Sequence, residues 1–434
     1  MTTLTFSARR KEPSLVGPAA PTPRETKRLS DVDDQEVLRK HVSFVSFYHG
    51  GSRAEVVEHR DPATVIRRAL EAALVPYYPL AGRLREVEGR KLVVDCTGEG
   101  VLFVEADADV RLAELEAAGL WAPFPCLDQL LVDVEISSGM LGCPLLFVQV
   151  TRLLCGGFVL ALRMNHTMFD AMGFAQFMSE VAQQARGLPA AEPAVWSREL
   201  LEAPPGLPPP PPTTFVPPRE LGDLVLRTFT FGRADVTAIK KRLPPKLRDT
   251  ATSFEALTAA LWRARTAALE LPPDRAVRLL VVVNFRRLTE LALPAGYYGN
   301  ACVTTAALTT AAALVVGSLG DAAALVRAAK ATVTAEYVRS SLGRPLAARA
   351  QAAETFVVTD HRHAGFNRVD VGWGDPVYGG IAKGAVFGSS TLVSVKNADG
   401  EDAVGLFIVL PQPAMDRFTS ELHMLLASSR PWAN

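Results

Sequence analysis

A proline-rich stretch divides the chain into two halves. Residues 188–218 contain the run Pro208–Pro212 and further prolines on either side of it. Proline fixes its own backbone torsion and has no amide hydrogen, so such a stretch stays extended instead of joining a sheet or a helix. A chain of 434 residues is also long for one hydrophobic core. We therefore predict an N-terminal domain over 1–187, a linker over 188–223 and a C-terminal domain over 224–434.

Strand-like and helix-like patterns alternate on both sides of this linker. Short runs of β-branched and aromatic residues at 43–48 and 279–284 predict strands. Apolar residues at helical spacing predict a helix that begins near Asp61, a second helix over 170–186 and a third over 322–339. Because strands and helices alternate in this way, we predict an α/β fold.

Charge and cysteine content exclude several functional classes. The chain has 46 basic and 46 acidic residues, and no basic stripe suggests a nucleic acid or an anionic membrane as partner. The five cysteines are scattered and form no Cys-x-x-Cys pair, which favours reduced thiols over zinc or a disulfide framework. The N-terminus lacks the apolar segment of a signal peptide. We expect a cytoplasmic monomer that acts on small molecules.

The most informative motif is His166-x-x-x-Asp170-x-x-Gly173. The apolar run 158–162, which predicts a strand, precedes the motif, and the helix predicted over 170–186 follows it. The imidazole of His166 therefore lies at the turn between a strand and a helix. Short motifs also arise by chance. Two interpretations therefore remain open: a structural histidine beside an Asp170 N-cap, or a reactive histidine at the edge of a cleft.

Other sequence motifs that would indicate a hydrolase, a nucleotide-binding protein or a metal site are absent or incomplete. The sequence has no Gly-x-Ser-x-Gly elbow, no phosphate-binding loop of the Gly-x-x-x-x-Gly-Lys type and no Gly-x-Gly-x-x-Gly fingerprint. His361 and His363 could begin a metal site, but only Asp360 and Asp370 lie nearby as further ligands. We favour a solvated polar loop for this pair and expect no metal.

A lone histidine without a serine or cysteine nucleophile suits direct acyl transfer. Imidazole has a pKa near working pH, so it can take a proton from a hydroxyl or amine and later return it to a leaving group. The activated oxygen or nitrogen would attack a carbonyl group brought by a second substrate. A thioester donor needs no covalent enzyme intermediate, so no further nucleophile is required.

These residues together resemble those of the plant BAHD family of acyl-CoA-dependent acyltransferases. His166-x-x-x-Asp170 resembles the catalytic motif of that family, and Asp370-Val371-Gly372-Trp373-Gly374 resembles its Asp-Phe-Gly-Trp-Gly motif, with Val371 in place of the phenylalanine. The order and separation of the two motifs also fit. The resemblance extends over nearly the whole chain, through the segments 77–83, 284–286 and 296–300.

The resemblance implies two similar domains of the chloramphenicol-acetyltransferase kind, with a crossover linker and an active-site tunnel between them. It implies that His166 is the general base and that Asp170 is structural, paired with Arg286. Trp373 would lie near the transition state and offer its indole N–H to an oxyanion. A structural loop far from the chemistry is the alternative for Asp370 and Trp373. The glycines expected to shape these two motifs are Gly173, Gly372 and Gly374.

By the same resemblance, acyl-CoA would be a co-substrate and no cofactor would be bound permanently. Ser253, as the N-cap of a helix, is a candidate for binding the phosphates of coenzyme A, with a plain structural cap as the alternative. Arg287 and Lys383 are weaker candidates. Phe44 and Ser46, on one face of a predicted strand, are candidates for the acceptor pocket.

The segments 6–10 and 29–36 are similar to those of a branch that includes benzyl alcohol O-benzoyltransferases and other alcohol acyltransferases. This implies a small alcohol as acceptor and an aromatic or short acyl group as donor. N-acylation, hydroxycinnamoyl transfer, a non-catalytic acyl-CoA-binding homologue and a plain thioesterase remain alternatives. A carrier-protein condensation domain fits less well, because Asn165 precedes His166 and Ala171 follows Asp170.

Overall fold

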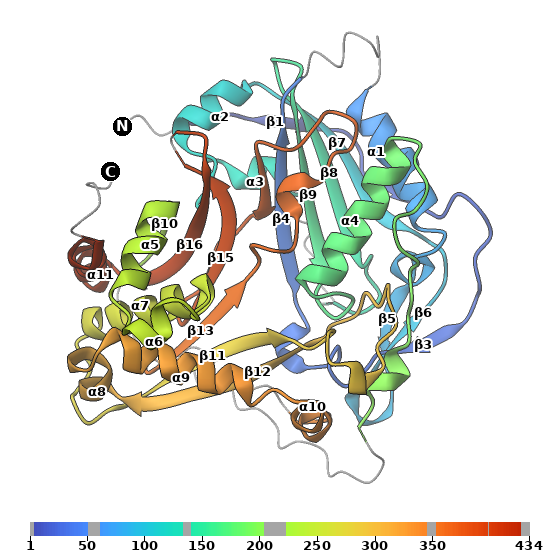
Figure 1. The fold of residues 1–434 in the computed structure, drawn as a ribbon. Coiled ribbons are helices and arrows are strands. Elements are labelled where there is room, and N and C mark those ends of the chain that lie inside the picture. Colours follow the sequence, from blue (N-terminus) through green and yellow to red (C-terminus); the bar gives the residue numbers. More distant parts are fainter. Residues whose placement is uncertain are drawn as a thin grey trace.

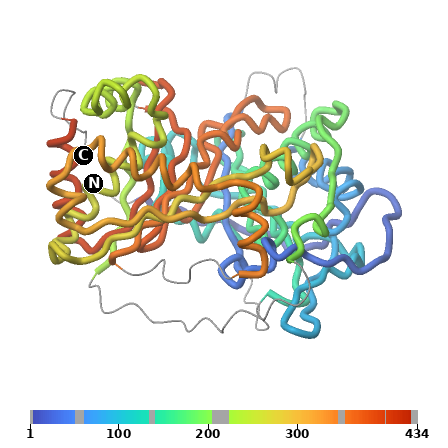
Figure 2. Tube along the Cα trace, turned by 60° about the horizontal axis from the view of Figure 1, so that its bottom comes forward, coloured from blue at the N-terminus to red at the C-terminus, as the bar shows by residue number. Residues whose placement is uncertain are grey.

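The computed structural model describes residues 4–50, 61–132, 140–203, 223–344, 353–397 and 399–426. Two large mixed sheets lie side by side, each with helices packed against it (Figure 1). The blue and green part of the chain, which supplies all strands of the N-terminal sheet except β14 (Tyr378–Ile381), lies beside the yellow to red part, which supplies the C-terminal sheet (Figure 2). The Pro208–Pro212 run of the predicted linker lies outside the described residues.

The N-terminal sheet has the strand order β1-β7-β8-β9-β4-β14, with β2 paired to the edge of β7. Helices α1 and α4 contact each other and belong to the same hydrophobic core as the sheet. The elements are β1 (Ala8–Arg10), β2 (Ser14–Val16), β4 (His41–Tyr48), α1 (Pro62–Ala73), β7 (Val101–Ala108), α2 (Leu112–Ala118), α3 (Leu127–Leu130), β8 (Leu146–Arg152), β9 (Phe158–Asn165), α4 (Ala171–Ala185) and β14 (Tyr378–Ile381).

A small sheet, β3 (Thr26–Arg28), β6 (Leu92–Asp95) and β5 (Arg83–Glu86), joins the same half.

The C-terminal sheet has the order β10-β16-β15-β13-β11-β12, and β11, β13 and β15 run parallel. A second core, which includes Trp262, Val326 and Phe418, packs its helices against one face. The elements are β10 (Leu224–Phe231), α5 (Arg233–Lys241), α6 (Pro245–Arg248), α7 (Ser253–Ala268), β11 (Ala276–Asn284), β12 (Cys302–Thr310), α8 (Ala311–Val316), α9 (Leu319–Ala331), α10 (Ala335–Ser341), β13 (Thr355–Asp360), β15 (Ser389–Lys396), β16 (Asp402–Pro411) and α11 (Gln412–Leu426).

One strand crosses between the halves. β14 follows β13 in the chain but pairs with β4 in the N-terminal sheet, where Ile381 lies opposite Phe44 and Gly379 opposite Ser46. The two sheets therefore share chain segments, and sequence periodicity gave no sign of this exchange because β14 is only four residues long.

Local signals in the sequence correctly predicted several elements. Asp61 caps α1 and Asp170 caps α4, each through backbone N–H groups that donate to its carboxylate. Two expectations were wrong. The single helix predicted over 322–339 is two helices, α9 and α10, because Thr334 accepts a hydrogen bond from the Tyr337 amide and starts a new helix.

The other wrong expectation is that Ser253 is the N-cap of α7, which is one residue too late. Thr252 is the N-cap, since its hydroxyl accepts a hydrogen bond from the Glu255 amide, and Ser253 is the first helical residue. Glu255 in turn accepts from the Thr252 amide at 3.1 Å. The two residues thus form a reciprocal capping box that already satisfies this helix end.

Candidate active site

His166 lies in the turn between β9 and α4, as the sequence predicts. Its amide donates to the carbonyl oxygen of Lys40 at 2.9 Å, and its own carbonyl accepts from Asn300 Nδ2 at 2.9 Å. Lys40 belongs to the N-terminal half and Asn300 to the C-terminal half. The backbone that carries the imidazole is therefore held from both sides.

The ring of His166 is oriented by one contact, between its Nδ1 and the carbonyl oxygen of Phe169 at 2.8 Å. A carbonyl oxygen can only accept a hydrogen bond, so Nδ1 carries the proton and Nε2 has a free lone pair. Burial, followed by the nearby Lys40 ammonium, lowers the pKa of His166. The imidazole is therefore neutral at pH 7 and able to act as a base through Nε2.

Asp170 points toward the C-terminal half and accepts hydrogen bonds on both carboxylate oxygens. Arg286 donates two hydrogen bonds to it, at 2.7 and 2.8 Å, and the Ala301 amide donates a third at 2.9 Å. The amides of Met172 and Gly173 donate at the start of α4. Burial alone would raise the pKa of Asp170, but Arg286 and these donors lower it. The ion pair between Asp170 and Arg286 that the resemblance implies is present.

A second buried ion pair supports the same turn and was not predicted from the sequence. Asp33 is fully buried and accepts from both the amide and the Nδ2 of Asn300, at 2.9 and 2.8 Å. Arg198 lies 3.4 Å from Asp33 and donates to the carbonyl of Met168 at 2.8 Å. The sequence shows turn signals near residues 33 and 300. No local pattern, however, links Asp33, Arg198 and Asn300, because they lie so far apart in the chain.

Gly173 is required by close packing. A Cβ atom added at this position would lie 1.9 Å from the carbonyl oxygen of Tyr298, so only glycine lets α4 approach that segment. The segment 296–300, which carries Tyr298 and Asn300, thereby contacts both the start of α4 and the backbone of His166. The resemblance pointed to this segment without assigning it a contact.

Hydrogen bonds within the Asp370–Gly374 loop form a tight turn, and Arg186 at the end of α4 forms an ion pair with Asp370 at 3.6 Å. Asp370 accepts from the amides of Gly372 and Gly374 at 2.8 and 2.7 Å, and both glycines have positive φ, +106° and +83°. Val371 is fully buried in the N-terminal core. These contacts favour the structural interpretation of the loop.

The expected position of Trp373 near the transition state is wrong. Its ring packs edge-on against Phe158, with 5.1 Å between the ring centroids. Phe158 starts β9 and His166 follows the end of that strand, so the two residues are roughly 26 Å apart at about 3.3 Å per residue. The indole N–H of Trp373 is thus too far away to stabilise an oxyanion formed at His166.

The three residues predicted to bind coenzyme A lie on three separate segments: the start of α7, the loop after β11 and the loop after β14. Ser253 is half-buried at the start of α7, whereas Arg287 and Lys383 are exposed on loops. None of them lines a cleft of about 420 Å³ that the described residues form. That cleft lies over β11, β12 and α10 and includes Arg278, Cys302, Tyr337, Ser341 and Arg344.

This cleft leads to the histidine turn. Cys302 lines the cleft, and its Sγ lies 3.4 Å from the Asp170 carboxylate. Arg278 and Arg344 supply two guanidinium groups to its wall, and no sequence motif had marked either of them. The cleft therefore carries two guanidinium groups and one carboxylate, that of Asp31, and reaches the Asp170 carboxylate through Cys302.

Phe44 and Ser46, the candidates for the acceptor pocket, lie on β4. Phe44 is buried, and its ring packs against Phe174 at 4.5 Å and Phe366 at 4.8 Å between centroids. Ser46 is half-buried opposite Gly379.

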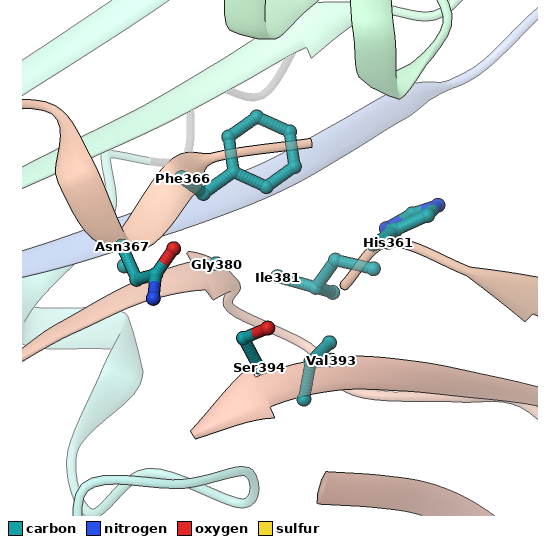
Figure 3. Close-up of a pocket in the computed structure, with 8 residues that line it drawn as sticks. His361, Phe366, Asn367, Gly380, Ile381, Val393 and Ser394 are labelled. Atoms are coloured by element: carbon teal, nitrogen blue, oxygen red, sulfur yellow. The ribbon is translucent and has the colours of Figure 1, made fainter. Parts of the chain in front are cut away.

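The His361–His363 segment differs from the solvated loop that we favoured. His363 is exposed, but His361 lines a small cavity of about 10 Å³ together with Phe366 and Ile381 (Figure 3). Within the described ranges, no three His, Cys, Asp or Glu side chains are grouped as metal ligands would be. In the same ranges, no helix has both the length and the apolar character needed to cross a membrane.

Comparison with known proteins gives consistent results over the full length. The sequence matches the Transferase family over residues 7–425. It is 47% identical to benzyl alcohol O-benzoyltransferase of Petunia hybrida, covering 98% of this chain and 94% of that protein. It is 45% identical to (Z)-3-hexen-1-ol acetyltransferase of Arabidopsis thaliana, covering 99% and 97%.

Solved structures show the same fold at low sequence identity. Vinorine synthase superposes with a TM-score of 0.76 at 20% identity and covers 97% of this chain and 98% of its own. TRI101 of F. graminearum, complexed with coenzyme A and T-2 mycotoxin, gives a TM-score of 0.70 at 14% identity, with 91% and 96% coverage.

Proposed function

The chain belongs to the Transferase (BAHD) family, and on that premise we propose that it transfers an acyl group from an acyl-CoA thioester to the hydroxyl of a small alcohol. The observation that carries this proposal is the geometry of His166. Its Nδ1 is fixed as a donor to the Phe169 carbonyl, which leaves Nε2 as a base. No nucleophilic serine or cysteine is needed for this chemistry.

In the proposed reaction, Nε2 of His166 removes the proton from the acceptor hydroxyl as its oxygen attacks the thioester carbonyl. The tetrahedral intermediate then collapses, the carbon–sulfur bond breaks, and the imidazolium returns the proton to the departing sulfur. The products are an ester and free coenzyme A. Asp170 and Arg286 contribute by holding the turn, because the carboxylate is satisfied by Arg286 and by backbone donors.

For the acyl-CoA, we propose the cleft over β11, β12 and α10 in place of the three residues suggested by the sequence. Arg278 and Arg344 lie in its wall and suit phosphate groups, since guanidinium pairs well with phosphate oxygens. Cys302 joins the cleft to Asp170. A structural neighbour crystallised with coenzyme A has the same fold, which makes such a site reasonable in this architecture.

For the acceptor, we propose an uncharged alcohol of about the size of benzyl alcohol, with an aromatic or short acyl donor. Relatives at 45–47% identity are named for benzyl alcohol and (Z)-3-hexen-1-ol as acceptors. We further propose that residues 1–187 and 224–434 form the two halves around a tunnel, with β14 exchanged between them. The enzyme would act as a cytoplasmic monomer without a permanent cofactor.

The direct test is the release of free thiol from benzoyl-CoA in the presence and absence of benzyl alcohol. We expect release that depends on the alcohol and is lost in His166→Ala. His363→Ala is the matched control, because His363 is exposed. Equal turnover in wild type and His166→Ala would remove the proposed base. Thiol release that ignored every added alcohol or amine would instead identify a thioesterase.

A further inference from the structure

The C-terminal ends of two parallel strands bring His361 to the same edge of the sheet as Arg286. β11 and β13 are paired in register through Val281 and Val358. Continuing this register by three residues places His361 beside Asn284. Arg286, which forms the ion pair with Asp170, follows two residues after Asn284. The His361 amide is also fixed to β15, by donating to the Leu392 carbonyl at 2.8 Å. This edge is therefore the one that faces the His166 turn.

His361 contains a buried nitrogen that no group in the described residues satisfies. Its Nδ1 is shielded from solvent and has no hydrogen-bond partner. The neighbouring carboxylate of Asp360 forms a two-point ion pair with Arg362, at 2.7 and 2.8 Å, and no hydrogen bond with Nδ1 of His361. An unpaired buried polar group costs stability, so one that persists indicates a missing ligand or water.

The environment keeps this imidazole uncharged. Burial lowers the pKa of His361 to about 4, with His166 adding a smaller effect in the same direction and Asp360 opposing it. His361 is therefore neutral at pH 7. The effect of His166 on this pKa is electrostatic, so the two imidazoles lie within interaction range of each other.

The small cavity beside His361 is lined only by apolar or uncharged residues. The small cavity beside it is lined by Phe366, Ile381 and Val393, with Asn367 and Ser394 as polar groups and no charged side chain (Figure 3). His361 packs near the Phe366 ring, which in turn contacts Phe44. The cavity lies between β14 of the N-terminal sheet and β15 of the C-terminal sheet.

We infer that His361 positions the acceptor alcohol, with its Nδ1–H donating to the hydroxyl oxygen while the hydroxyl hydrogen points to Nε2 of His166. This inference rests on the proposed function and names the acceptor class: a neutral alcohol with an apolar or aromatic body. Phe366 lines the cavity beside His361, and the rings of Phe44 and Phe174 pack against Phe366 from behind. His361 is a positioning and specificity residue, and His166 remains the base.

The test separates the two substrates kinetically. His361→Leu should raise the KM for benzyl alcohol about 3- to 10-fold, the usual effect of losing one neutral hydrogen bond, with the KM for benzoyl-CoA unchanged within about twofold. His361→Asn places an amide group where Nδ1 was and should stay close to wild type. His361→Gln places its amide near the Nε2 position and should behave like the leucine variant.

His363→Leu is the matched control, two residues away and exposed, and should leave both KM values unchanged. Melting temperatures report folding separately, and His361→Leu should melt at or above the wild-type temperature because the unpaired nitrogen is gone. A wild-type KM for benzyl alcohol in His361→Leu would overturn the inference. So would equal losses for both substrates, or a fall in kcat alone.

If wild type itself showed no alcohol-dependent thiol release, the proposed function would fail instead. The two failures are therefore distinguishable in one set of assays. If His361→Leu does not fold, His361→Asn and His361→Gln still decide the question, because they differ only in where the amide group lies. Equal KM values for benzyl alcohol in these two variants would contradict a role for Nδ1.

Discussion

The Nδ1 atom of His166 lies 2.8 Å from the carbonyl oxygen of Phe169, three residues further along the same turn. This contact sets both the tautomer and the direction of the ring, because the carbonyl can only accept. Backbone hydrogen bonds from Asn300 and to Lys40 fix the turn itself. Among the described residues, a backbone carbonyl orients the imidazole and leaves the lone pair of Nε2 free, whereas an aspartate takes this place in a catalytic triad.

The pH dependence of the reaction should follow the lowered pKa of His166. Its usual value is 6.5, and burial together with Lys40 moves it down. Protonation, which removes the lone pair of Nε2, then occurs only at a lower pH. We expect kcat/KM to stay level through neutral pH and to fall only as the pH drops below 6.5. A pH–rate profile with an acid limb centred above that value would contradict this assignment.

Replacing Asp170 should affect folding as well as rate. Asp170→Asn keeps the shape but leaves the guanidinium of Arg286 without its charge partner, which should cost about 3 kcal/mol of the free energy of unfolding. Chemical denaturation of Asp170→Asn, Arg286→Gln and the double variant measures this. The double variant should lose less than the sum of the two single losses. Unchanged stability with a large rate loss would point to a direct chemical role for Asp170.

Replacing Trp373 should lower stability and leave the chemistry intact. The ring is half-buried against Phe158, so Trp373→Ala should cost about 2 kcal/mol through lost packing. The kcat at a temperature where the variant is folded should remain near wild type. Trp121→Ala is the control, because Trp121 is 41% exposed and its loss should matter less. A large fall in kcat without a change in melting temperature would restore Trp373 to the reaction centre.

The binding of coenzyme A should depend on Arg278 in the cleft over β11, β12 and α10, and not on Arg287, which is exposed on a loop. Arg278→Gln should raise the KM for acyl-CoA about tenfold, because a charged hydrogen bond to phosphate is lost, and should leave the KM for the alcohol unchanged. Arg287→Gln is the matched control, since that side chain is exposed outside the cleft. Initial-rate measurements with each substrate varied in turn distinguish the two sites. The opposite result would favour the assignment made from sequence.

The sequence by itself determined the features that depend on neighbouring residues. Helical spacing and the carboxylates of Asp61 and Asp170 specified where two helices begin, because an N-cap needs only the next three amides. The strand–histidine–helix corner at His166 followed from one apolar run and one amphipathic helix. The resemblance also supplied the Asp170–Arg286 pair, whose members are 116 residues apart in the chain.

Only the tertiary structure decided which distant segments meet. It paired β14 with β4, joined Asp33 to Arg198 and Asn300, placed Trp373 at the far end of β9, and brought His361 to the sheet edge that carries Arg286. None of these contacts leaves a periodic pattern, because each depends on how two sheets pack together. Local residue order sets the elements, and the burial of side chains between the sheets decides which of them form the site.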